Sequence, residues 1–149
     1  MEEKFNKVPT WAVFRIQGQG WVEVDGVNYQ YHLLEKKQES RFPNFVEWKD
    51  TEFLFISEEV PVEYREFVLT HEIREFTVYR NEKAPCVRAL ISELGEVPRD
   101  MLPVYARWRL EFFEGFLAFL RIEKKDGDLE HQVEETVMLL RNIEAAVED

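Results

Sequence analysis

The segment Val60–Arg80, VPVEYREFVLTHEIREFTVYR, decides how the rest of the chain is arranged. Its apolar residues recur at helical spacing, and Pro61 stands in an opening turn rich in glutamate, which suits the positive end of a helix dipole. The apolar residues form two arcs on opposite sides of this helix. We therefore predict a helix over about 61–80 that is packed between a sheet and other helices.

One of the two arcs also carries polar side chains. His71 and Glu75 lie one turn apart on the same helical face. Their apolar neighbours on this face are Tyr64, Phe67, Val68 and Val78. Burying an imidazole and a carboxylate costs several kcal/mol unless a partner compensates each of them. The pair is therefore the feature of this chain that most needs a chemical explanation.

The N-terminal half has the pattern of strands and turns. In Trp21–Tyr31, WVEVDGVNYQY, Asp25-Gly26 supplies the two left-handed residues of a type I′ turn, which pairs Val24 with Val27. The face expected to pack on a core holds Val22, Val24, Val27, Tyr29 and Tyr31. A strand over Trp11–Ile16 should stop at a turn over 18–20, and 45–56 should hold one or two more strands.

The sequence after Ser57 is typical of helices. Pro85 opens a short second helix that Gly95 should close, a long helix follows over about 104–124, and Asp128 is the expected N-cap of a final one. The predicted fold class is α+β, with a small, mostly antiparallel N-terminal sheet followed by about four helices. A chain of 149 residues fits a single domain, 1–149.

Composition excludes several classes of partner. Thirty acidic against nineteen basic residues give a net charge of −11, which repels a phosphate backbone, so we expect no nucleic acid and no anionic membrane as partners. No apolar run approaches the roughly 18 residues that a membrane span needs. The lone Cys86 and the acidic start MEEKFNK point to a reducing cytoplasm.

The tetrad around His71 has the residue types of a metal site. His71 and Glu75, four residues apart on a helix, place an imidazole nitrogen and a carboxylate where both can reach one ion. Glu72 falls about 100° round the helix from His71, where it can hold a metal-bound water and act as general base. A divalent metal is therefore the expected cofactor, with zinc first and iron or manganese second.

The pattern His71-Glu72-x-x-Glu75 resembles the HExxH motif of zincin metallopeptidases, including a strand ahead of the motif helix. It departs from that motif at Glu75, where the zincin pattern has His, so the resemblance implies a degenerate HExxE form. In the gluzincin branch the third ligand is a glutamate on the next helix, and the resemblance assigns this role to Glu93. Cys86 on the same helix is the alternative donor, because a thiolate is a good zinc ligand.

A structural interpretation competes with the metal site. An inward His71 can hydrogen-bond Glu75 or a tyrosine hydroxyl, and an inward carboxylate can pair with Arg88, Arg107 or Arg109. Under this alternative the chain is a non-catalytic interaction domain with a protein or peptide partner. An open cleft at His71 favours a metal enzyme, whereas a sealed core with an exposed aromatic patch elsewhere favours the interaction domain.

Overall fold

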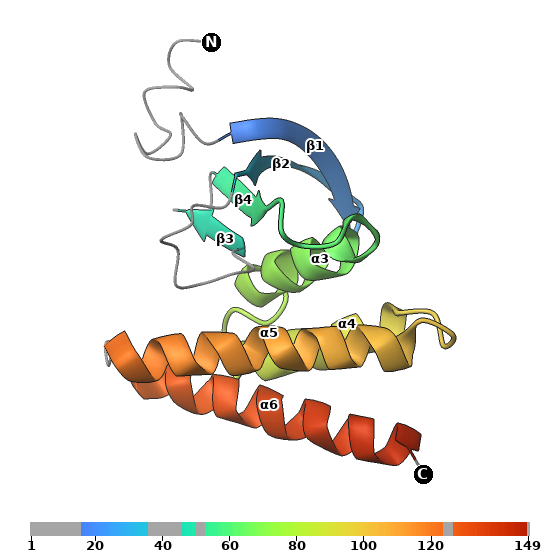
Figure 1. Cartoon of the computed structure of the whole chain (residues 1–149). Helices are drawn as coiled ribbons and strands as arrows, with labels where there is room; N and C mark the ends of the chain where they lie inside the picture. Colours follow the sequence, from blue (N-terminus) through green and yellow to red (C-terminus); the bar gives the residue numbers. More distant parts are fainter. Residues whose placement is uncertain (1–15, 36–45, 50–52, 124–126, 149) are drawn as a thin grey trace. The chain divides into compact units, whose positions relative to one another are not determined.

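The computed structural model describes residues 16–35, 46–49, 53–123 and 127–148, and within these residues the fold is α+β as predicted (Figure 1). Contacts divide the chain into two compact units, 1–72 and 73–149. The division falls inside a single continuous helix, α3, which spans Arg65–Phe76. The assignment of one domain stays a prediction. The expected strand before Ile16 and the segment 36–45 lie outside the described residues.

The first unit contains a four-stranded sheet in the order β1-β2-β4-β3. Its strands are β1 (Ile16–Val24), β2 (Val27–Leu34), β3 (Val46–Lys49) and β4 (Phe53–Ser57). β1 pairs with β2 and β3 pairs with β4 in antiparallel fashion, whereas β2 and β4 run parallel. The sheet is thus mostly antiparallel, as expected. The parallel pair arises because the chain crosses to β3 before it returns as β4 beside β2.

The β1–β2 hairpin has the predicted turn and register. Asp25 and Gly26 have φ values of 52° and 83°, and Val24 faces Val27 across the turn. Val22 and Val24 are buried, but Val27 is 50% exposed, so the prediction that it packs on a core was wrong. Val27 directly follows the Asp25-Gly26 turn and therefore lies at the tip of the hairpin.

The turn expected over 18–20 is absent, because β1 continues through both glycines. The register shifts between Ile16 and Gly18, which is the irregularity that the glycines allow. Gly20 lies opposite Tyr31, and a Cβ atom at Gly20 would come within 2.5 to 2.9 Å of the phenol of Tyr31. Gly20 therefore gives the Tyr31 ring room to lie across β1.

The helices differ from the predicted ones mainly at their ends. After η1 (Val62–Tyr64), α3 stops at Phe76 and not near Arg80, because the Thr77 hydroxyl bonds the Ile73 carbonyl oxygen at 2.8 Å and the Tyr79 N–H bonds the Arg74 carbonyl oxygen at 2.9 Å. α4 spans Pro85–Glu96, so Gly95 lies inside it and does not close it.

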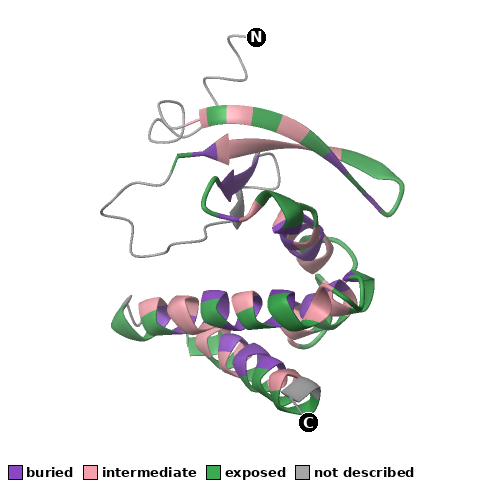
Figure 2. Cartoon of the chain, turned by 45° about the vertical axis from the view of Figure 1, so that its right-hand side comes forward, coloured by how far each residue is buried: buried purple, intermediate pink, exposed green. Residues whose placement is uncertain are grey.

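The second unit is built on the long helices α5 (Leu102–Glu123) and α6 (Gly127–Glu148). They pack against each other, α4 contacts α6, and buried positions recur along α5 and α6 at helical spacing (Figure 2). Asp128 lies in the first turn of α6, since the helix already begins at Gly127. No helix within the described residues is long and apolar enough to cross a membrane.

Candidate metal centre

Helix α3 carries His71 and Glu75 on one face, one turn apart. His71 is only 3% exposed, and the neighbouring Val68 and Ile73 are fully buried, whereas Glu72 and Glu75 are half-buried. Because α3 is continuous across the division between the two units, the spacing of His71 and Glu75 follows from the helix alone. The predicted inward orientation of the imidazole is confirmed.

Cys86 reaches the same place from the start of α4. Ala84 adopts a left-handed conformation, with φ 51° and ψ 62°, and Pro85 is the first residue of the helix. No side chain of the N-cap residue satisfies the first turn. The Cys86 N–H instead donates to Oε1 of Gln132 on α6 at 3.3 Å, and Nε2 of Gln132 donates to Asp128 at 3.1 Å. Gln132 thus fixes the turn that carries the thiol.

Arg74 holds the last turn of α3 against α4. Its Nη1 donates to the hydroxyl of Ser92 at 2.8 Å and forms an ion pair with Glu96. Ser92 and Glu96 lie four residues apart on α4, so both face the same arginine. This attachment lies wholly within the second unit and sets the distance between the turn that bears Glu75 and the helix that bears Cys86.

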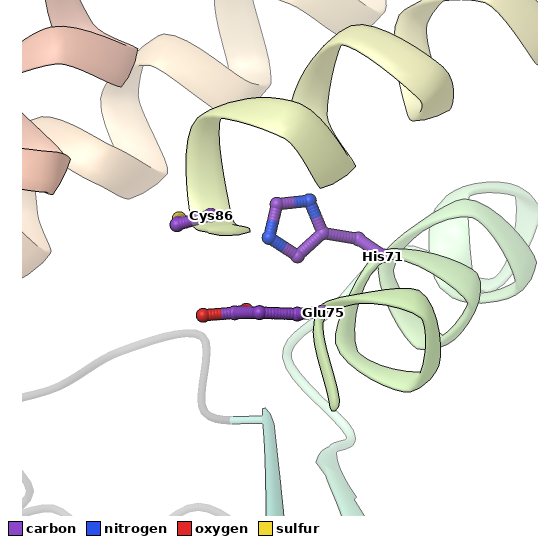
Figure 3. Close-up of side chains that lie close together, drawn as sticks. All are labelled: His71, Glu75 and Cys86. Carbon is purple, nitrogen blue, oxygen red and sulfur yellow. The ribbon is translucent and has the colours of Figure 1, made fainter. Parts of the chain in front are cut away.

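The three side chains form a candidate metal centre (Figure 3). One nitrogen of His71, one oxygen of Glu75 and the sulfur of Cys86 all lie within 4.8 Å of one another. Ligands held at about 2.0–2.3 Å from a tetrahedral ion stand roughly 3.3–3.7 Å apart, so small side-chain rotations would bring these atoms onto one ion. Cys86, which the sequence offered as the alternative to Glu93, is the third member of this group.

Glu93 lies in a different environment. Arg109 donates to both of its carboxylate oxygens, from Nε at 2.9 Å and from Nη2 at 3.0 Å, and the hydroxyl of Tyr105 donates to it as well. Burial by itself would lower the pKa of Arg109, but the negative charge of Glu93, the electrostatic contributions of Tyr105 and Cys86 and the hydrogen bond to Glu93 together raise it above its usual value. The bonds to Arg109 and Tyr105 thus engage both carboxylate oxygens of Glu93.

The sequence pointed to His71, Glu75 and Cys86 as possible ligands. It did not indicate that Tyr105 binds Glu93 or that Gln132 caps α4. The sequence indicated that an inward carboxylate can pair with Arg88, Arg107 or Arg109, and the structure shows such a pair between Glu93 and Arg109. The spacing of Tyr105 and Arg109, four residues apart, puts both polar ends on one face and was the available signal. Gln132 gave no local signal, because it caps a helix that begins 47 residues earlier in the sequence.

Comparisons with known proteins identify no relative. No family model, no curated protein and no solved structure matches this chain.

Proposed function

We propose that this chain is a metal-binding protein with a zincin-like motif helix, in which His71, Glu75 and Cys86 hold a divalent ion. The observation that carries the proposal is the convergence of three different donor types within 4.8 Å. Nitrogen, sulfur and carboxylate oxygen together suit zinc first, with iron or manganese second. Three protein ligands leave a fourth position for water or a further group.

Burial favours a structural or regulatory ion over peptide hydrolysis. His71 is 3% exposed and Cys86 is 4% exposed, whereas a peptidase must admit a polypeptide to its ion. The second candidate function is hydrolysis by a degenerate HExxE peptidase, which is supported by Glu72, half-buried and adjacent to His71 on the motif helix. In that role Glu72 would hold the water beside the ion and accept its proton.

The proposal uses Cys86 in preference to Glu93 as the third ligand. The carboxylate of Glu93 is paired with the buried guanidinium of Arg109. If this carboxylate bound a metal instead, the guanidinium would be left buried without its partner. The thiol of Cys86, by contrast, already lies within 4.8 Å of ligand atoms of His71 and Glu75. The glutamate assigned by the gluzincin resemblance therefore acts, in our proposal, as a structural anchor of α4.

The test is metal content and metal-dependent stability of protein purified without a histidine tag. At a hundredfold excess over Kd, a bound ion raises the free energy of unfolding by about 2.7 kcal/mol. We expect this increment in the wild type and in Glu72→Gln. It should vanish in His71→Ala, Glu75→Gln and Cys86→Ser, because each removes one proposed ligand.

His131 provides a matched control for His71. It also has a glutamate four residues later, with Nε2 at 3.0 Å from Glu135, but the pair is exposed on α6 and includes no thiol. His131→Ala should leave the metal increment unchanged. A wild-type protein that contains no metal and gains nothing from zinc, iron or manganese would exclude the proposal and leave the His71–Glu75 pair as core architecture.

A further inference from the structure

A groove of about 530 Å³ lies in the first unit, between the β1–β2 hairpin and the start of α3. Buried Val22 and Leu69 contribute apolar surface to it. Its volume falls within the range of about 300–1,000 Å³ that binding sites have. The residues that line it are Trp21, Val22, Glu23, Asp25, Gly26, Tyr31, Val62, Arg65, Glu66 and Leu69.

Two aromatic rings and an exposed valine line this groove. Trp21 is 66% exposed and Val62 is 72% exposed, although large apolar side chains are usually covered. The ring of Tyr31 has room across β1 because Gly20, opposite it, has no side chain. An indole and a phenol in one groove present the electron-rich faces on which a cation is stabilised.

The charged residues that line the groove favour a positively charged ligand. Three carboxylates, from Glu23, Asp25 and Glu66, stand against the single guanidinium of Arg65. Arg65 is itself held by the backbone, since Nε donates to the Val60 carbonyl oxygen at 2.9 Å and Nη2 to the Glu58 carbonyl oxygen at 3.1 Å. These backbone bonds fix the position of Arg65, and its single positive charge stands against three negative ones, so the lining is net negative.

We propose that this groove binds an arginine-bearing segment of a partner protein, with the guanidinium stacked on Trp21 or Tyr31 and paired with Glu23 or Glu66. A planar guanidinium combines aromatic stacking with forked hydrogen bonds to carboxylate, and this groove supplies both partners. The volume exceeds that of one side chain, which favours a peptide segment over a free ammonium ion. This inference is independent of the proposed metal centre, whose residues do not line the groove.

The probe is the capped peptide Gly-Arg-Gly-Arg-Gly, titrated into the full chain at 150 mM salt and followed by amide and indole NMR shifts. We expect saturable shifts at the Trp21 indole N–H and at the Gly26 amide. Trp21→Ala and the double variant Glu23→Gln/Glu66→Gln should each weaken binding at least tenfold. The double variant Glu82→Gln/Glu111→Gln removes the same charge from exposed positions outside the groove and should bind as the wild type does.

Three comparisons separate the proposed ligand from its alternatives. A lysine version of the peptide should bind more weakly, and a glutamine version should not bind. Free guanidinium that matches the peptide in affinity would overturn the peptide as occupant. Shifts spread over the acidic surface, with the two double variants equally weakened, would reduce the interaction to general attraction by a chain of net charge −11 and refute the groove.

Discussion

The guanidinium of Arg109 donates to both carboxylate oxygens of Glu93, at 2.9 and 3.0 Å, where the two side chains are 1% and 0% exposed. The ion pair joins α5 to α4, and the arginine also lies over the rings of Phe112 and Phe113, at 4.7 and 4.5 Å from their centroids. A buried pair of this kind is expensive to break, because the remaining charge loses its partner in a site that water does not reach.

The first prediction follows from this ion pair. Glu93→Gln and Arg109→Met should each lower the free energy of unfolding by about 3–5 kcal/mol, measured by urea denaturation. The triple variant Glu93→Leu/Tyr105→Phe/Arg109→Met should recover most of that loss, since it removes every polar group of the cluster together. Equal losses in single and triple variants would show that packing, and not the unpaired charge, sets the cost.

The second prediction concerns pH. The pKa of Arg109 is raised in the folded protein, so the pair stabilises the fold fully below the unfolded pKa and loses this effect only as pH rises through the still higher folded value. The destabilisation caused by Arg109→Met should therefore be the same at about pH 7 and about pH 10. If Arg109→Met no longer destabilised the protein at about pH 10, the guanidinium would have to lose its proton at a far lower pH than its raised pKa allows.

The third prediction concerns Gln132 as the cap of α4. Gln132→Ala removes the acceptor for the Cys86 N–H and should cost about 1 kcal/mol of stability, as the loss of a helix cap does. If Cys86 is a ligand, metal affinity should fall as well, because the turn that positions the thiol frays. Asp128→Asn keeps an acceptor for Nε2 of Gln132 and leaves the cap itself in place, so it should retain both properties, which separates capping from a general effect of substitution at this contact.

The fourth prediction concerns the hairpin turn. Gly26 has φ 83°, so Gly26→Val forces a β-branched residue into a left-handed conformation and should cost about 1 kcal/mol or more. Gly18→Val is the matched control, because a side chain at Gly18 meets open space in the same strand pair. Thermal unfolding of both variants gives the comparison. Equal melting temperatures would argue against strain at Gly26.

Local features of the sequence determined the hairpin turn, the inward position of His71 and the fold class. The Asp25-Gly26 turn and its register follow from neighbouring residues, because a type I′ turn admits few residue types and the pairing of each following residue is then fixed. The inward position of His71 likewise follows from helical periodicity. The α+β class follows from the change between these two patterns along the chain.

Tertiary structure decided which of the polar residues meet. Glu93 and Cys86 lie on the same helix, and sequence alone offered either as the third ligand. Arg109, sixteen residues later, pairs with Glu93 and leaves Cys86 beside Glu75 and His71. Gln132 completes the start of α4 from another helix. Such partners depend on how separate helices pack, and periodicity within one helix shows which way a side chain points but not what it meets there.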